Sequence, residues 1–215
     1  MPLLSWHTMC NAYYSLVTVF QAERQSMRDE YKIGVKGIPL KIDTVSVPSF
    51  PGLIGICACP GMKEFSTLDL YDDRIENDLQ CISNWGARAI VTVLDMNEIS
   101  ALGVTALPAR IVARDIVWLH LPMSNNLLPE EKFEEQWCSV RTKLLQFLRQ
   151  GERILIHCKE GIGRSALVAV RLLIDAGIDT DSAIKAVRKA RQGSLMLYSQ
   201  EKYCLSLVAA ADNSA

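Results

Sequence analysis

The segment between residues 154 and 165 constrains the fold of this chain more than any other. It opens with three apolar residues, continues with His157 and Cys158, and reaches Arg164 and Ser165 after five residues that include two glycines. A long segment with helical apolar periodicity follows. This order predicts a buried strand that passes through a tight loop into a helix. A cysteine and an arginine therefore stand at the two ends of one loop.

The rest of the chain alternates between strand-like and helix-like segments. Strands are predicted at 38–47, 53–58, 89–94, 116–121 and 154–156. Helices are predicted over 75–85, 96–102, 133–150 and 164–176, then from a cap at Thr180 or Asp181 and from a cap at Ser199. This alternation predicts an α/β fold, with a central, mostly parallel sheet flanked by helices on both faces.

Composition excludes several classes of protein. Nearly half of the 215 residues are hydrophobic, so extensive disorder is not expected, and the net charge of −1 argues against a general nucleic-acid binder. The seven cysteines are irregularly spaced, which is typical of a reduced cytoplasmic protein. The scattered histidines and cysteines predict no metal site.

The first part of the chain differs from the rest. Residues 3–20 are moderately apolar but lack a basic start and are interrupted by His7, Asn11 and Ser15, so we expect neither a signal peptide nor a membrane span. Residues 11–31 have helical character. We therefore expect 1–37 to be a separate, helical N-terminal extension.

The loop after the 154–156 strand has the residues of an anion site. Backbone N–H groups converge in a glycine-bearing turn at a helix N-terminus, and Arg164 adds a planar fork that matches two phosphate oxygens. The same field is expected to lower the pKa of Cys158 and make it a nucleophilic thiolate. Ser165 would donate to the sulfur when it leaves, and His157 would orient the loop from the strand side.

The run His157-Cys158-x-x-Gly161-x-Gly163-Arg164-Ser165 resembles the signature loop of the cysteine-dependent protein tyrosine phosphatase superfamily. Within its dual-specificity branch, the chain is most similar to the kinase-associated phosphatase (cyclin-dependent kinase inhibitor 3-like) group. Four further segments match: Cys59-Pro60-Gly61, Trp85-Gly86-Ala87, Trp118-Leu119-His120-Leu121-Pro122 and Arg191-x-Gly193 with Gln200.

The resemblance implies a protein tyrosine phosphatase-like catalytic domain over 38–215. Its substrates would be phosphorylated proteins or peptides, hydrolysed through a phosphocysteine without cofactor or metal. Cys158 would be the nucleophile, Arg164 would bind the phosphoryl group, and Gln200 would position the hydrolytic water. The residues implied to line the phosphate site are His157, Lys159, Glu160, Gly161, Ile162, Gly163 and Arg164.

The chain departs from the family at the general acid. Relatives carry an aspartic acid shortly after the strand that ends at Pro122, and this position holds Asn125, or Asn126 if the register shifts by one. An amide cannot deliver a proton. Glu130 and Glu131, or Asp72 and Asp73, are substitute candidates, although all four also fit ordinary helix starts. An Asp-to-Asn change introduced to trap a substrate would give the same sequence.

Several alternatives follow from these residues. The missing acid also fits a phosphate-recognition module with little turnover. Lys159 resembles phosphoinositide-directed relatives, although a solvated lysine fits as well, and a cysteine loop also occurs in rhodanese-type sulfurtransferases. Cys59 is predicted to be a buried cysteine or a disulfide partner of Cys158. The basic stretch 185–191 fits a solvated helix face, or a surface that holds an acidic substrate.

Overall fold

The computed structural model describes residues 39–62, 74–124 and 128–212. The predicted N-terminal extension at 1–37 lies outside the described residues, as do Asp72, Asp73, Asn125 and Asn126. Strands and helices alternate along the described part, and the last three elements are helices. None of its helices combines the length and the apolar character needed to cross a membrane.

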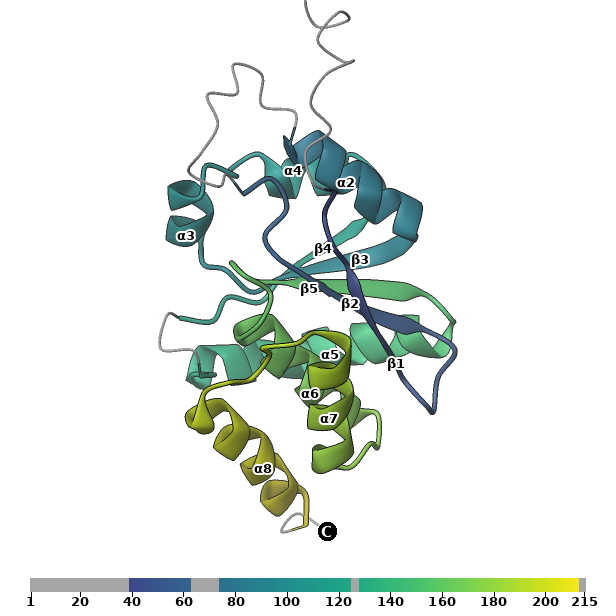
Figure 1. The fold of residues 1–215 in the computed structure, drawn as a ribbon, viewed down its shortest axis with the longest axis vertical. Coiled ribbons are helices and arrows are strands. Elements are labelled where there is room, and N and C mark those ends of the chain that lie inside the picture. The colour runs from purple at the N-terminus through teal and green to yellow at the C-terminus, as the bar shows by residue number, and fades with distance from the viewer. Residues whose placement is uncertain (1–38, 63–73, 125–127, 213–215) are drawn as a thin grey trace, which may run out of the picture. The chain divides into compact units, whose positions relative to one another are not determined.

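A five-stranded sheet forms the centre of the fold (Figure 1). Its spatial order is β1-β2-β5-β3-β4, with β1 antiparallel to β2 and every other neighbouring pair parallel. The mostly parallel sheet predicted above is therefore confirmed. The strands are β1 (Asp43–Ser46), β2 (Leu53–Cys57), β3 (Ala87–Thr92), β4 (Val117–His120) and β5 (Arg153–His157).

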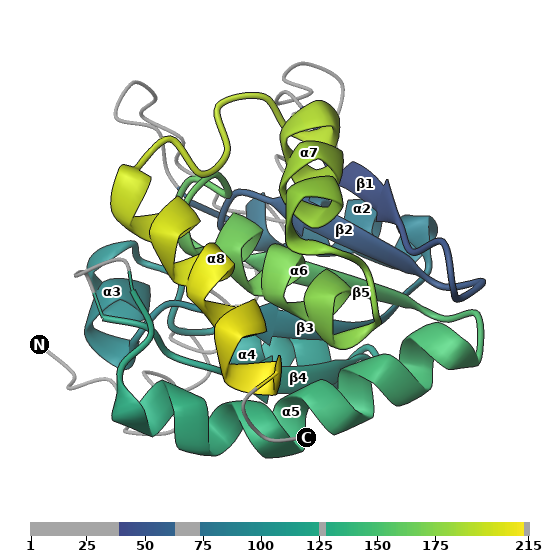
Figure 2. The same cartoon turned by 90° about the horizontal axis from the view of Figure 1, so that it is seen from below.

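Helices cover both faces of this sheet, as predicted (Figures 1 and 2). One face carries α2 (Arg74–Trp85), α3 (Met96–Ala101) and α4 (Leu107–Val112). The other carries α5 (Glu131–Arg149), α6 (Arg164–Asp175), α7 (Thr180–Ala190) and α8 (Tyr198–Asp212). Because both faces are covered, the inner strands are mostly apolar, and Ile54, Ile90 and Ile156 are completely buried.

The apolar stripe predicted on the 133–150 helix is confirmed in α5. Its members face the core and are buried: Phe133, Trp137, Val140, Leu144 and Leu148. Helix α4 was not predicted, because six residues are too few to show a periodicity. Such a short helix depends on packing, and α4 lies against β4 and α2.

Several predicted boundaries were wrong by a few residues, and the strand predicted at 89–94 is β3 at Ala87–Thr92. Asp179 caps α7 by accepting the Ser182 N–H at 2.9 Å, so the cap precedes both predicted positions. Helix α8 begins at Tyr198, which places Ser199 inside its first turn. The predicted strand at 38–47 shortens to four residues, because β1 pairs only with β2 and its register ends at Asp43 and Ser46.

Candidate active site

The signature loop follows β5 at the carboxyl edge of the sheet. Cys57, Thr92 and His157 end three adjacent parallel strands in register with one another. Loop residues 158–163 then run directly into α6. Crevices outside the carboxyl ends of parallel strands are where ligands bind in open α/β sheets.

Cys158 is the first residue of this loop and is only 4% exposed. The backbone N–H of Gly161 donates to its Sγ at 3.2 Å, and the Ser165 Oγ lies 3.3 Å from the same atom. The sulfur also lies next to the N-terminus of α6, a helix of 12 residues. Donated hydrogen bonds and the positive end of a helix both stabilise negative charge on sulfur.

Glycine is favoured at the two loop positions 161 and 163 for different structural reasons. Gly161 has a φ of +76°, and a Cβ on it would lie 2.3 Å from the carbonyl oxygen of Cys57. Gly163 is the N-cap of α6, with a φ of −101° and a ψ of −91°. A Cβ on Gly163 would instead lie 3.3 Å from the Gln200 Nε2. Gln200 is thus brought against the loop, as its predicted role requires, and is 1% exposed.

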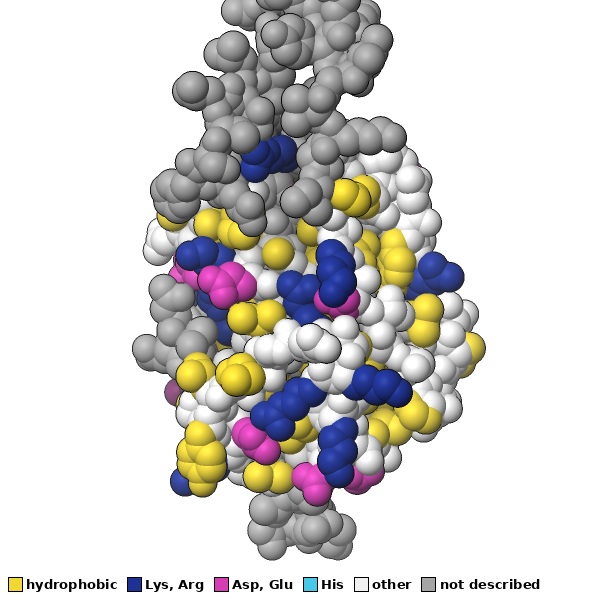
Figure 3. Space-filling view, in the orientation of Figure 1, with side chains coloured by type: hydrophobic (Ala, Val, Ile, Leu, Met, Phe, Trp, Pro, Cys, Tyr) yellow, Lys and Arg dark blue, Asp and Glu magenta, His cyan; other side chains and the backbone are white. Residues whose placement is uncertain are grey.

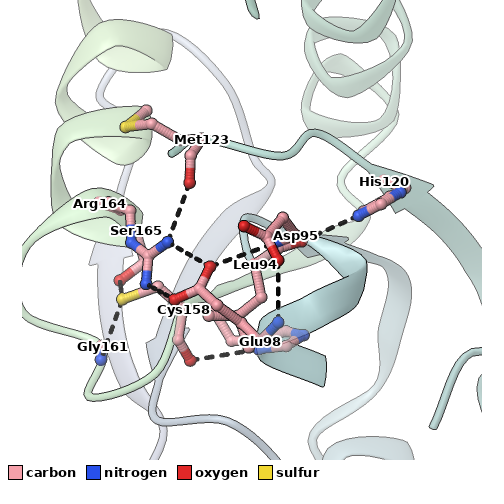
Figure 4. Close-up of polar contacts among 10 residues, drawn as sticks. Leu94, Asp95, Glu98, His120, Met123, Cys158, Gly161, Arg164 and Ser165 are labelled. Atoms are coloured by element: carbon pink, nitrogen blue, oxygen red, sulfur yellow. Dashed lines mark hydrogen bonds and ion pairs between the residues drawn. The ribbon is translucent and has the colours of Figure 1, made fainter. Parts of the chain in front are cut away.

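Arg164 is buried and locked in place by a carboxylate (Figure 4). Its Nη2 donates to Glu98 Oε1 at 2.6 Å, and its Nη1 donates to Glu98 Oε2 at 2.7 Å and to the Met123 carbonyl oxygen at 2.9 Å. Burial by itself lowers the pKa of Arg164, but the hydrogen bonds that it donates to Glu98, together with the charge of Glu98, outweigh burial and raise it. The guanidinium is therefore charged.

This ion pair uses only part of the guanidinium. Within the described residues, the Nε–H and the second Nη2–H of Arg164 form no hydrogen bond. These two groups lie along one edge of the planar fork, with the spacing that matches two oxygens of a phosphate. The arginine is thus held by one edge and keeps the other for an anion.

Sequence reasoning missed Glu98. It belongs to a capping box at the start of α3, in which Asp95 Oδ1 accepts the Glu98 N–H at 2.8 Å and Glu98 Oε2 accepts the Asp95 N–H at 3.1 Å. Figure 4 shows Glu98 between Asp95 and Arg164. The available signal was the Asp-x-x-Glu pattern directly after β3, which opens a helix at the same sheet edge as the cysteine loop.

His157 belongs to a buried chain of polar groups that begins at Trp118. The Trp118 Nε1–H donates to Thr92 Oγ1 at 2.9 Å, and that hydroxyl lies 2.8 Å from the His157 Nε2. An indole N–H only donates, so the Thr92 hydroxyl keeps its own hydrogen to donate to the His157 Nε2. The proton of the neutral ring is therefore on Nδ1, which lies 3.4 Å from the Cys158 carbonyl oxygen. The ring thus contacts the backbone at Cys158 from the strand side, the side from which the sequence predicts that it orients the loop.

Complete burial of His157 lowers its pKa to about 4. The unfolded chain, with a histidine pKa of about 6.5, binds this proton more readily. We therefore expect the free energy of unfolding to fall by about 3 kcal/mol as the pH drops from 6.5 to 4 on account of this residue. Urea unfolding of the wild type and His157→Gln at several pH values measures the difference, and parallel pH profiles would contradict it.

The remaining predicted residues are distributed around the loop. Lys159 and Glu160 are exposed, and the Ile162 carbonyl oxygen accepts the Leu195 N–H at 3.0 Å. Glu130 accepts a hydrogen bond from Ser124, and Glu131 begins α5.

Cys59 is buried, and burial raises the pKa of its thiol to about 12, with the nearby Cys158 contributing. Cys59 is therefore a neutral thiol, which fits the predicted role of a buried cysteine.

The catalytic-domain model of the dual specificity phosphatases matches residues 90–207, more than half of the chain. The chain belongs to the dual specificity phosphatase family. It is a phosphatase of the protein tyrosine/dual-specificity type, and the matched region contains both the cysteine loop and Glu98. This family match disfavours the sulfurtransferase alternative.

This phosphatase is similar to one relative over most of its length and to another over about a third of it. It is 27% identical over 182 residues to cyclin-dependent kinase inhibitor 3 of Homo sapiens, covering 81% of this chain and 82% of the relative. Protein tyrosine phosphatase type IVA 3 of Homo sapiens is 29% identical over 75 residues, covering 34% of this chain and 42% of that one.

The fold is also similar to that of a kinase-associated phosphatase. A crystal structure of kinase-associated phosphatase, with serine in place of the catalytic-site cysteine, superposes with a TM-score of 0.68 at 25% identity. The match covers 79% of this chain and 94% of that one. The predicted protein tyrosine phosphatase-like fold and the resemblance to the kinase-associated group are both confirmed.

Proposed function

We propose that this phosphatase hydrolyses phosphotyrosine, and phosphoserine and phosphothreonine where they reach the loop, through a phosphocysteine on Cys158. The observation that carries the proposal is the position of the Cys158 sulfur. It lies between the Gly161 N–H and the Ser165 hydroxyl, beside Arg164, whose guanidinium pairs with Glu98 along one edge only. Relatives named cyclin-dependent kinase inhibitor 3 and kinase-associated phosphatase support phosphorylated proteins as substrates.

In the first step, the thiolate attacks phosphorus in line with the bond to the leaving oxygen. A sulfur–phosphorus bond forms, the phosphorus–oxygen bond breaks, and the leaving oxygen takes a proton. The free edge of Arg164 and the loop amides hold the three non-bridging oxygens, where charge develops in the transition state. Such donors cost no reorganisation, because Glu98 already holds the guanidinium in place.

In the second step, water attacks phosphorus and the sulfur leaves as a thiolate. The Ser165 hydroxyl, 3.3 Å from the sulfur, donates to it as its charge returns. Gln200 lies against Gly163 and would orient the water through its amide. The products are inorganic phosphate and the free enzyme.

We infer that protonation of the leaving oxygen limits the rate of the reaction. Asn125 takes the position of the usual aspartic acid, and Glu98 is no substitute because both of its oxygens pair with Arg164. A positioned acid contributes about 10²–10⁴-fold to a rate. Turnover should therefore be fast only for esters whose leaving group needs no proton.

Hydrolysis of a chromogenic aryl phosphate tests the proposed activity directly. With p-nitrophenyl phosphate we expect multiple turnovers without added metal, inhibited by vanadate, because a nitrophenolate leaves without protonation. Phosphopeptides should react more slowly by at least about 10²-fold in kcat. Absence of aryl phosphate turnover in folded protein would refute a working phosphatase.

Asn125 also favours one alternative, a phosphate-recognition module that binds phosphopeptides with little turnover. Rapid-quench measurement with a phosphopeptide separates the two functions. A burst of phosphocysteine without steady release of phosphate supports the recognition module, and steady turnover rules it out. A phosphoinositide substrate, the other alternative from the sequence, is tested in the same assay with a soluble phosphoinositide.

A further inference from the structure

Helix α8 carries Gln200 but packs little apolar surface against the rest of the fold. Of the side chains that the structure describes on α8, at 198–207, only Gln200 and Cys204 are buried. The residues around its start face solvent, since Met196 and Tyr198 are 78% and 79% exposed. Figure 3 shows hydrophobic side chains on the surface at the lower left, over the start of α8. The position of Gln200 therefore depends on the polar contacts of this helix.

A cluster of three polar side chains joins α8 to α6 and α5. We call it the Arg171 cluster, and its other members are Glu134 and Tyr203. The Arg171 Nη1 and Nη2 donate to the two Glu134 oxygens, both at 2.6 Å. The Tyr203 hydroxyl accepts a hydrogen bond from Arg171 and donates to Glu134 Oε1 at 2.7 Å. Burial and the hydrogen bond to Glu134 raise the pKa of Tyr203, so its hydroxyl keeps the proton that it donates.

The Arg171 cluster is firmly held on the side of α5 and α6. The Arg171 side chain is 12% exposed, and its guanidinium carbon lies 5.0 Å from the centroid of the Trp137 ring. A guanidinium at this distance over an indole is attracted by the ring. Helix α8 also contacts α7 through an ion pair of Arg188 and Glu201, but both side chains are 39% exposed, and such exposed pairs contribute little.

The Arg171 cluster lies one helical turn from Gln200. Tyr203 follows Gln200 by three residues, so both side chains lie on the same face of α8. This face meets α6, across which α8 lies in Figure 2. Gly163, the N-cap of α6, is the loop residue next to the Gln200 amide. Because α6 also carries Arg171, one helix fixes both the end of the phosphate loop and the turn of α8 that holds Gln200.

We propose that the Arg171 cluster positions Gln200 for the second chemical step, so that its amide orients the water that attacks the phosphocysteine. The proposal rests on the phosphatase activity and the role of Gln200 proposed above. The first step does not use this water, so the Arg171 cluster affects only the hydrolysis of the phosphocysteine. Tyr203 is thus a positioning residue, which acts through Gln200 and not on the substrate itself.

The test measures the two steps separately with p-nitrophenyl phosphate. Release of p-nitrophenol in rapid mixing gives the rate constant for phosphocysteine formation, and decay of the radiolabelled phosphocysteine gives that for its hydrolysis. The variants are Tyr203→Phe, which removes only a hydroxyl, Gln200→Ala and the double variant. The matched control is Asp175→Asn, because Asp175 accepts hydrogen bonds from Trp137 at 2.9 Å and Arg141 at 3.4 Å and so joins α6 to α5 without α8.

In Tyr203→Phe, hydrolysis of the phosphocysteine should slow by about 10-fold, within the 10²-fold that a misplacement of about 1 Å can cost. Its formation, and with it kcat/KM, should stay unchanged. Gln200→Ala should slow hydrolysis at least as much. The double variant should be no slower than Gln200→Ala alone, because Tyr203 acts through Gln200. Asp175→Asn should change neither rate constant.

Three results would overturn the proposal: an equal loss in both steps of Tyr203→Phe, unchanged hydrolysis in Tyr203→Phe where Gln200→Ala slows it, or additive losses in the double variant. Unchanged hydrolysis in Gln200→Ala would refute the role of Gln200 and this proposal, but not Cys158 as the nucleophile.

If the wild type forms no phosphocysteine, the phosphatase proposal fails separately. The NMR signal of the Gln200 side-chain amide then tests the positioning by itself. A shift of this signal in Tyr203→Phe, and none in Asp175→Asn, supports positioning by the Arg171 cluster. A signal that Tyr203→Phe leaves unchanged, or that Asp175→Asn shifts equally, refutes it.

Discussion

Cys158→Ser is expected to abolish turnover of aryl phosphates and phosphopeptides, with a loss in kcat of more than about 10⁴-fold. Loss of a nucleophile that forms the covalent intermediate costs up to about 10⁶-fold in comparable enzymes. A serine hydroxyl is not ionised near neutral pH. Among the described residues, the only side-chain group at hydrogen-bond distance from the Cys158 sulfur is the Ser165 hydroxyl, which is not a base. Steady-state hydrolysis of p-nitrophenyl phosphate measures the effect.

The matched control is Cys138→Ser, which changes an exposed cysteine on α5 and should leave the rate unaltered. Phosphopeptide binding to Cys158→Ser should persist, because Arg164 and the loop amides remain. Residual turnover within about tenfold of the wild type would contradict Cys158 as the nucleophile and would assign the chemistry to another group.

Asn125→Asp is expected to raise kcat on phosphopeptides by about 10²–10⁴-fold. The introduced carboxylic acid would protonate the leaving oxygen of tyrosine or serine and later accept a proton from water. The rate on p-nitrophenyl phosphate should change much less in the first step, because its leaving group needs no proton. The two effects are separated by measuring kcat across a series of aryl phosphates, whose dependence on leaving-group pKa should flatten in the variant.

Asn126→Asp is the control for this substitution, since it introduces the same charge one residue later. An increase with Asn126→Asp and none with Asn125→Asp would move the acid position by one residue. A flat response in both variants would show that neither position faces the leaving group, and Glu130→Gln would then test the next carboxylate along the chain.

The arrangement of the loop residues was predictable because it is local. Cys158, Arg164 and Ser165 lie within eight consecutive residues, and a strand–loop–helix order alone brings them together at a helix N-terminus. The long helices and inner strands were predictable for the same reason, since each carries a complete apolar period. The alternation of these elements then limited the fold to a covered, mostly parallel sheet.

The partners of these residues were not predictable. Glu98 lies 66 residues before Arg164, and Thr92 lies 65 residues before His157. Nothing in the local pattern distinguishes Glu98 from an ordinary capping residue, because the capping box already accounts for it. The pair formed by Asp43 and Arg191 joins residues 148 apart, and neither was singled out as one half of an ion pair.

The sequence by itself determined the proposed reacting groups, the layered α/β architecture and an amide, in place of a carboxylic acid, at position 125, because local order and residue type decide each of these. Only the tertiary structure decided how the reacting groups are held. The parallel strands β3 and β5 pair in register, and this pairing brings the start of α3 beside the loop after β5. The guanidinium of Arg164 is thereby fixed by a distant carboxylate along one edge, with the other edge left for phosphate.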